Sequence, residues 1–269
     1  IEEIVTGGMP TDFEMPIGER VGRPVRQRNA TRRYVDFVKE TTNVRLDGLH
    51  VVLDPMYGVS KTALQTILLT TRCDVEVIHE RRDTLFGGRL PAPNLKTLAG
   101  LTNYVEEHGC DIGIATDGDA DRLGVIDDKA EFLHPNKILV LLYYYLMRYR
   151  GWRGAAVRNL ATTHLLDRIA EDFGETCYEV PVGFKYVSAK MVETGAIIGG
   201  ESSGGLTVRG HIQGKDGIYA AALLVEAIAK TGRRLSALWD EITQKYGAAE
   251  MAEHDFHFSS AERTRSFKL

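Results

Sequence analysis

The residues best suited to chemistry in this chain lie between Ala115 and Arg122. Asp117, Asp119 and Asp121 occupy alternate positions directly after an apolar run, and Arg122 follows them. Carboxylates this close repel one another, and a hard divalent cation offsets that repulsion. Because the run contains no Cys or His, its ligand set indicates Mg²⁺ or Ca²⁺ rather than Zn²⁺.

One alternative for this acidic run is an EF-hand loop, which also begins with acidic residues at alternate positions. Such a loop needs a Gly at its sixth position and a Glu at its twelfth. Those positions hold Arg122 and Asp128 here, which excludes an EF-hand. A Mg²⁺ ion held by three carboxylates keeps coordination positions open for water or a phosphate oxygen. The pattern therefore favours a catalytic metal site over the plainer alternative, a solvated acidic turn between two strands.

Composition limits the class of protein. The chain has 269 residues, of which 43% are hydrophobic and 26% charged, with a formal net charge of −4. No long basic run is present, which argues against nucleic acid as a partner. The most apolar stretch, residues 137–147, is too short to span a bilayer, so no membrane partner is expected. Three cysteines without metal-binding spacing predict reduced thiols in a cytoplasmic protein.

The order of strand and helix patterns predicts an α/β fold, with two consecutive α/β/α sandwich domains and mainly parallel sheets. Residues 41–151 form the first expected domain, which carries the acidic loop, and residues 152–247 form the second. Residues 1–40 are interpreted as the tail of a preceding domain and a linker. Because the chain starts abruptly, as if within a helix, we expect it to be a fragment.

The boundaries of the expected elements follow from apolar periodicity and turn residues. Strands are expected at 49–54, 75–78, 111–115, 122–127, 155–158, 176–180, 196–199, 206–208 and 255–258. Helices are expected at 29–41, 60–68, 94–108, 135–149, 163–173, 186–193, 216–230 and 236–246. Ser60 and Asn94 are expected to cap two of them, and Asp216, which follows Lys215, is interpreted mainly as a third cap. The acidic loop then lies at the carboxyl end of a strand, where open parallel sheets bind ligands.

Two further stretches contain groups suited to a site. Lys185 follows Gly183 and Phe184 at the end of a strand, where its amine could enter a cleft and transfer protons. A surface lysine at a helix start is the simpler alternative. Glu201 and Ser203 lie between pairs of glycines, and a carboxylate with a hydroxyl suits the recognition of sugar hydroxyls, although a plain Gly-Ser turn explains the same pattern.

Taken together, these motifs resemble the α-D-phosphohexomutase family of phosphoglucomutases and phosphomannomutases. After the acidic run come Val182-Gly183-Phe184-Lys185-Tyr186 and Gly200-Glu201-Ser202-Ser203-Gly204-Gly205, in the order and spacing of that family. A Gly-Arg-x-Pro-x-Pro turn at 88–93 and the run at 215–218 add to the match. The resemblance covers residues 49–246 and implies domains two and three of a four-domain enzyme, with residues 248–269 as a linker towards a missing fourth domain.

The resemblance also implies a role for each residue of the first motif. Asp117, Asp119 and Asp121 would hold Mg²⁺, which would also touch the phosphate of a phosphoserine. Arg122 would lie beside the phosphoryl group that is transferred.

For the second half of the chain, the resemblance implies contacts with the substrate. Gly183 and Lys185 would contact it, and Lys185 would be the candidate for proton transfer. Glu201 and Ser203 would bind sugar hydroxyls. Some family members instead carry a lysine after the first strand of domain three, where this chain reads Asn159-Leu160-Ala161-Thr162-Thr163.

The activity that the resemblance implies is the interconversion of hexose 1-phosphate and hexose 6-phosphate, with glucose favoured and mannose left open. The expected partners are hexose phosphate, hexose bisphosphate and the missing first and fourth domains of the same protein. The sequence contains neither a Ser-His-Asn-Pro loop for the phosphoserine nor an Arg-x-Ser-Gly-Thr phosphate clamp. We therefore expect the fragment alone to be inactive. The alternatives are a non-catalytic phosphosugar-binding or scaffold protein built from the same domains, and a metal-dependent phosphatase with an Asp nucleophile.

Overall fold

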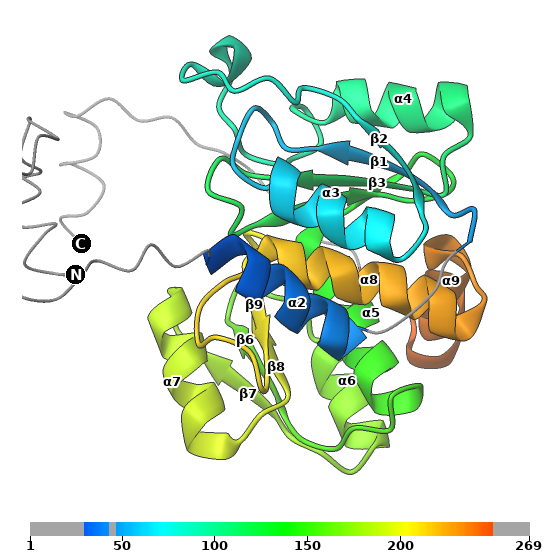
Figure 1. Cartoon of the computed structure of the whole chain (residues 1–269). Coiled ribbons are helices and arrows are strands. Elements are labelled where there is room, and N and C mark those ends of the chain that lie inside the picture. Colours follow the sequence, from blue (N-terminus) through cyan, green and yellow to red (C-terminus); the bar gives the residue numbers. More distant parts are fainter. Residues whose placement is uncertain (1–29, 43–46, 250–269) are drawn as a thin grey trace, which may run out of the picture.

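A computed structural model describes residues 30–42 and 47–249 of the chain. Its strands form two sheets, with the orders β2-β1-β3-β4-β5 and β7-β6-β8-β9, which lie one above the other in Figure 1. The strands that alternate with helices pair in parallel, whereas β4, β5 and β9 are antiparallel to their neighbours. The predicted α/β fold with two α/β/α units and mainly parallel sheets is confirmed.

The elements of the first unit and its approach are α2 (Ala30–Thr42), β1 (His50–Asp54), α3 (Lys61–Thr70), β2 (Asp74–Val77), the short 3₁₀ turn η1 (Phe86–Gly88), α4 (Ala99–His108), β3 (Ile112–Thr116), β4 (Leu123–Ile126), β5 (Phe132–Leu133) and α5 (Pro135–Arg148). The second unit contains β6 (Ala156–Asn159), α6 (Leu165–Asp172), β7 (Cys177–Val180), α7 (Phe184–Thr194), β8 (Ile198–Gly200), β9 (Leu206–Val208), α8 (Gly217–Thr231) and α9 (Leu235–Tyr246).

Strand β1 shows how the sequence builds two cores. Its apolar run is buried throughout, which is typical of a strand covered on both faces. Because successive side chains point to opposite faces, Val51 and Leu53 join the core under α3, whereas Val52 joins a separate core with Leu101 of α4. The sheet is therefore sandwiched between helices.

Helices α5 and α8 lie between the two sheets. Each contacts strands of both sheets, with α8 touching β3, β4 and β9 and α5 touching β4, β5 and β8. One continuous core consequently runs through both units. Helix α2 lies along α3 and α8 in Figure 1 and contacts both, so it joins the two units on the outside.

Most of the expected elements are present with small shifts at their ends, including the short helix after residue 29 and the long helix from Pro135. Ser60 occupies the predicted N-cap position directly before α3, but its side chain makes no capping hydrogen bond, and its Oγ instead accepts one from Thr116 Oγ1 at 2.7 Å. The helix expected from residue 94 starts later, at Ala99. Asn94 Oδ1 accepts hydrogen bonds from the main-chain N–H groups of residues 96 and 97, which closes a separate turn before the helix.

Residues 1–29 of the expected tail and linker, and the strand expected at 255–258, lie outside the described residues. Within residues 30–42 and 47–249, no helix is long and apolar enough to cross a membrane. The domain limits at residues 41, 151 and 247 stay predictions.

Candidate metal and sugar-phosphate site

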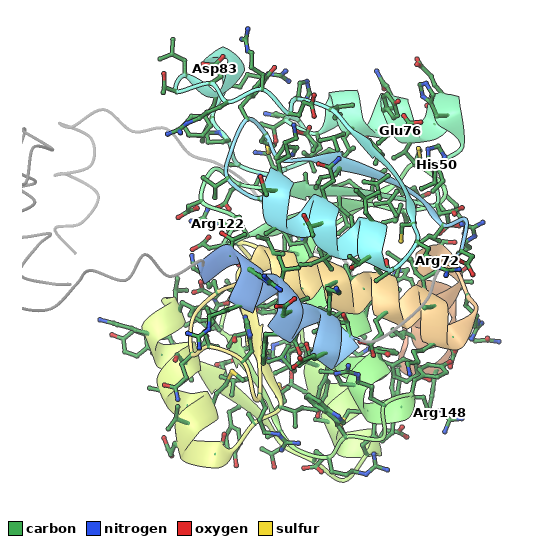
Figure 2. The ribbon with its side chains drawn as sticks, in the orientation of Figure 1. His50, Arg72, Glu76, Asp83, Arg122 and Arg148 are labelled. Atoms are coloured by element: carbon green, nitrogen blue, oxygen red, sulfur yellow. The ribbon has the colours of Figure 1, made fainter. Side chains whose placement is uncertain are left out.

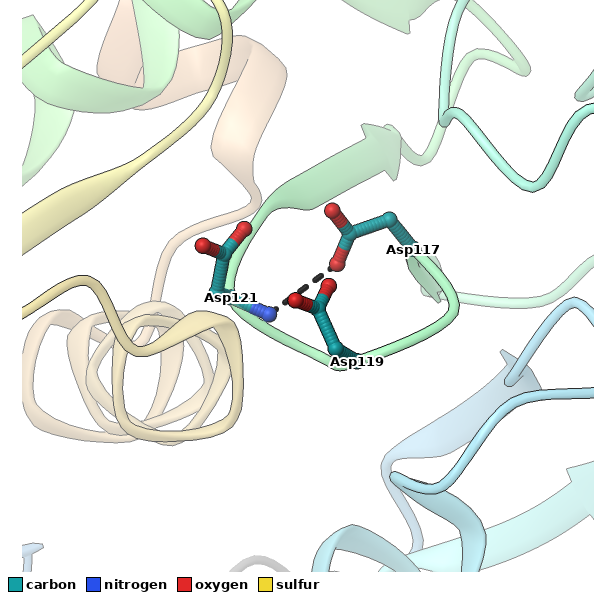
Figure 3. Close-up of side chains that lie close together, drawn as sticks. All are labelled: Asp117, Asp119 and Asp121. Carbon is teal, nitrogen blue, oxygen red and sulfur yellow. Dashed lines mark hydrogen bonds between the residues drawn. The ribbon is translucent and has the colours of Figure 1, made fainter. Parts of the chain in front are cut away.

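The acidic loop between β3 and β4 brings the three predicted metal ligands together. One oxygen from each of Asp117, Asp119 and Asp121 lies within 4.8 Å of the others. Figure 3 shows the three side chains close together on this loop. Asp117 Oδ1 closes the loop by accepting hydrogen bonds from the main-chain N–H groups of Asp121 at 3.0 Å and Arg122 at 3.1 Å. Ala120 adopts a left-handed backbone conformation with φ of 66°, which lets the chain turn back within a few residues.

The electrostatics of this loop favour a cation. Burial, with the negative charges of Asp121 and Asp119, raises the pKa of the Asp117 carboxyl to about 6, against the lowering effect of the hydrogen bond from Arg122 N. Clustered carboxylates that are partly withdrawn from water gain most from a divalent ion with oxygen preference. The donor set of three carboxylates therefore fits Mg²⁺.

Two basic side chains border the carboxylates. Arg122 Nε lies 3.6 Å from Asp117 Oδ2 and 3.7 Å from Asp121 Oδ1, and in the described part of the chain it has no hydrogen-bond partner. Lys215 Nζ lies 2.5 Å from Asp121 Oδ2. Figure 2 places Arg122 at the junction of the two units. The carboxylates thus have the positive charges of Arg122 and Lys215 beside them.

The second group of predicted residues gathers around Glu201, at the carboxyl end of β8. This side chain is 9% exposed, and its Oε1 accepts hydrogen bonds from Gly183 N at 3.1 Å and Asn159 Nδ2 at 3.4 Å. Gly183 has φ of 129°, a conformation that favours glycine. The ends of β6, β7 and β8 therefore meet at one carboxylate.

Lys185 and Ser203 do not enter this hydrogen-bonded group. Both are exposed, and Lys185 Nζ lies over the ring of Tyr186, 4.8 Å from its centroid. In the described residues neither side chain makes a hydrogen bond to Glu201.

The metal loop and the Glu201 loop are joined directly. Leu123 N donates to Gly204 O at 3.3 Å, next to an isolated antiparallel bridge between Arg122 and Gly205. Gly217 N donates to Ala120 O at 3.0 Å. These main-chain bonds connect the acidic loop to the loop that carries Glu201 and to the start of α8.

A cavity of about 610 Å³ lies elsewhere, beside the segment that follows β6. It contains none of the predicted site residues, and its lining includes Lys137, His164, Arg168 and Trp239. We locate the candidate site at the carboxylates, because the chemistry of a metal site depends on its ligands rather than on the depth of a hollow.

Two models of one protein family match most of this chain. Residues 32–130 match the family model described as phosphoglucomutase/phosphomannomutase, alpha/beta/alpha domain II, and residues 134–246 match domain III of the same family. This chain belongs to the α-D-phosphohexomutase family.

Individual relatives agree with this assignment. A phosphoglucomutase/phosphomannomutase of Thermococcus kodakarensis is 32% identical over 238 residues, which are 87% of this chain and 52% of that protein. A phosphoglucosamine mutase of Ruminiclostridium cellulolyticum is 32% identical over 246 residues, covering 88% and 53%. The chain thus spans about half the length of these curated relatives.

Solved structures give the same result. The crystal structure of a Thermus thermophilus protein described as a phosphomannomutase matches with a TM-score of 0.74 and 32% identity, over 81% of this chain and 51% of that one. An Aspergillus fumigatus N-acetylphosphoglucosamine mutase, solved in complex with GlcNAc-6P and magnesium, matches with a TM-score of 0.57 and 14% identity, over 78% and 52%. At that identity the likeness concerns the fold alone.

Sequence reasoning missed Lys215 as a neighbour of the metal loop. It read Lys215 with Asp216 as the start of a helix, and the structure confirms Asp216 as the cap, since its side chain accepts a hydrogen bond from Tyr219 N. The contact of Asn159 with Glu201 was not predicted either; Asn159 belongs to the stretch 159–163, where some family members carry a lysine. The sequence offers no local signal for either contact, because each partner lies far away along the chain.

Proposed function

We propose that this chain provides the metal-binding and sugar-binding part of a mutase that interconverts hexose 1-phosphate and hexose 6-phosphate. The observation that supports this most is the union of two groups: carboxylates within 4.8 Å of one another, on a loop hydrogen-bonded through Leu123 to the glycine-rich loop at Gly204. A phosphosugar needs both a charge-neutralising centre and hydroxyl recognition within one cleft. Membership of the α-D-phosphohexomutase family supports the same reaction class.

In this proposal the loop carboxylates of Asp117, Asp119 and Asp121 hold Mg²⁺. The bound ion would supply positive charge beside a phosphoryl oxygen. The Arg122 side chain, which is 42% exposed and lies beside Asp117 and Asp121, would bind the same phosphoryl group through its guanidinium. That arrangement stabilises charge during transfer by position and electrostatics rather than by covalent chemistry.

Substrate recognition is assigned to the second group. One oxygen of Glu201 accepts hydrogen bonds from Gly183 N and Asn159 Nδ2, and these bonds would orient the carboxylate towards sugar hydroxyls. Ser203 is exposed on the same loop, where its hydroxyl is available to the sugar. We favour glucose over mannose from the Glu-Ser-Ser form of the loop. The names of the relatives also include phosphoglucosamine mutases.

The proton-transfer group is proposed to be a lysine of this chain. Lys185 remains a candidate because it follows the Gly183 turn, and Lys215 becomes a second one because its amine lies among the metal ligands. The serine that carries the phosphoryl group is proposed to lie outside these residues, so the chain alone should not turn over substrate. The alternative function is a non-catalytic phosphosugar-binding or scaffold protein.

Calorimetric titration of Mg²⁺ into the metal-free chain, with and without glucose 1,6-bisphosphate, tests the proposal. We expect Mg²⁺ to bind, the bisphosphate to add its own heat, and Asp119→Asn to weaken Mg²⁺ binding at least about tenfold. Asp240→Asn, which changes an exposed aspartate outside the cluster, should bind Mg²⁺ like the wild type.

The outcomes separate the alternatives. No metal or bisphosphate binding would remove the roles proposed for both loops. A mutase assay of the 269-residue chain should give no turnover. Measurable isomerisation would show that these residues contain the whole catalytic apparatus. A scaffold protein would bind phosphosugar without dependence on Asp119.

A further inference from the structure

A polar cluster of Tyr34, His211 and Asp216 lies next to Lys215, which precedes Asp216 in the chain. His211 Nε2 and Asp216 Oδ2 are 2.6 Å apart, and their side chains are 3% and 9% exposed. Tyr34 of α2 donates its phenol to both oxygens of Asp216, at 3.0 and 2.8 Å. Burial and the neighbouring carboxylate raise the pKa of the Tyr34 phenol, so it remains a donor. Asp216 is thus held from two sides by residues that the proposed chemistry does not use.

Helix α2 also fixes the imidazole of this cluster. The ring of Phe37 stacks on His211 at 5.3 Å between centroids, and Tyr219 of α8 stacks on it at 4.4 Å. Stacking of this kind restricts the ring to one orientation. Helix α2 therefore supplies both the hydrogen bond from Tyr34 to Asp216 and the Phe37 ring that packs against His211.

Asp216 lies between two residues that touch the metal loop. On one side Lys215 reaches Asp121, and on the other Gly217 N donates to Ala120 O at 3.0 Å. Asp216 Oδ1 also accepts a hydrogen bond from Tyr219 N at 3.0 Å. With its carboxylate bonded on every side, Asp216 has little freedom, and that restriction extends to the Cα position from which the Lys215 side chain departs.

We infer that Tyr34 and His211 are positioning residues that act through Asp216 to hold the Lys215 ammonium against Asp121. The inference rests on the proposed metal site. A fixed ammonium stabilises the carboxylates when no ion is bound and competes with a divalent cation for them. Helix α2, which lies outside the site, then sets how tightly the carboxylate cluster binds Mg²⁺.

A double-mutant cycle between Tyr34→Phe and Lys215→Met tests this coupling, with the Mg²⁺ Kd of the 269-residue chain as readout. Lys215→Met should lower Kd about tenfold, because it removes a positive charge beside a divalent ion. Tyr34→Phe should lower Kd roughly threefold by releasing the lysine, and His211→Phe should do the same. In the Lys215→Met background, Tyr34→Phe should have no further effect.

Tyr145→Phe is the matched control. Tyr145 also donates its phenol to a buried carboxylate of α8, Glu226, at 2.5 Å. It should leave the Kd of Mg²⁺ unchanged. The inference is overturned if Tyr34→Phe leaves Kd unchanged, raises it, or shifts it equally with and without Lys215.

The same cycle, measured by urea unfolding without metal, separates this inference from the proposed function. If Tyr34 holds Lys215 against Asp121, the effects of Tyr34→Phe and Lys215→Met on the unfolding equilibrium constant should depart from additivity by about threefold. Coupling in a chain that binds no Mg²⁺ would refute the metal site and keep the positioning role. Mg²⁺ binding without coupling would refute the positioning role and keep the site.

Discussion

The ammonium of Lys215 lies 2.5 Å from Oδ2 of Asp121, and the two side chains are only 21% and 27% exposed. The residues come from different units of the chain, yet their charges meet at the edge of the carboxylate cluster. An ion pair withdrawn from water in this way is screened less than a surface pair. The acidic loop is therefore partly neutralised by the protein itself.

The two candidate lysines should differ in their effect on metal binding. Lys215→Met removes a charge that contacts a metal ligand and should tighten Mg²⁺ about tenfold, whereas Lys185→Met should leave Kd within about twofold of wild type. Lys185 is exposed and lies over Tyr186, so it makes no described contact with the carboxylates. Titration calorimetry at one ionic strength measures both. Equal effects would show that Lys185 also lies near the ion.

Metal binding should weaken in acid. The pKa of Asp117 is raised to about 6 by burial and by its acidic neighbours. A metal needs the deprotonated carboxylate, so a proton competes below that pH. Apparent affinity should be nearly constant from pH 7 to 8 and fall up to about tenfold per unit below pH 6. A profile that stays flat down to pH 5 would contradict the combination of a raised pKa at Asp117 and a role for this carboxylate in binding the ion.

The Glu201 loop should govern sugar binding without affecting the ion. Glu201→Gln keeps an oxygen that accepts from Gly183 N but removes the charge that strengthens hydrogen bonds from sugar hydroxyls. We expect weaker binding of glucose 1,6-bisphosphate by about tenfold and an unchanged Kd for Mg²⁺. Both are measured on the same sample. A parallel loss of metal affinity would mean that the substitution disturbs the acidic loop.

The main-chain junction between the units should be sensitive to one methyl group. A Cβ on Gly217 would lie 2.6 Å from Arg122 O and 3.0 Å from Ala120 O, so Gly217→Ala should destabilise the chain by about 1–3 kcal/mol. A Cβ on Gly214 meets only Ile212 Cδ1, at 3.8 Å, and Gly214→Ala should change stability by less than about 0.5 kcal/mol. Urea unfolding compares the two variants. Equal stability of the two variants would indicate that the backbone at Arg122 and Ala120 moves away from the added methyl group at little cost.

Local sequence was enough for much of the fold. The apolar runs of β1 and β3, Pro135 at the start of α5 and Asp216 at the start of α8 each specify structure through their immediate neighbours. The capping roles expected for Ser60 and Asn94 could not be decided from local sequence, because each side chain bonds to a group outside the helix that follows it. Ser60 does precede the first residue of α3, but its side chain bonds to Thr116 instead of the helix, and Asn94 closes a turn that ends before α4 begins.

The sequence by itself determined the acidic loop, because Asp117, Asp119 and Asp121 are close enough along the chain for a single turn to bring their oxygens together. Only the tertiary structure decided which groups surround it. Lys215 reaches Asp121, and Tyr34 reaches Asp216, because α8 packs between the two sheets and α2 packs along α8. Those contacts depend on burial of apolar faces that are remote in sequence, and no spacing of residues along the chain encodes their geometry.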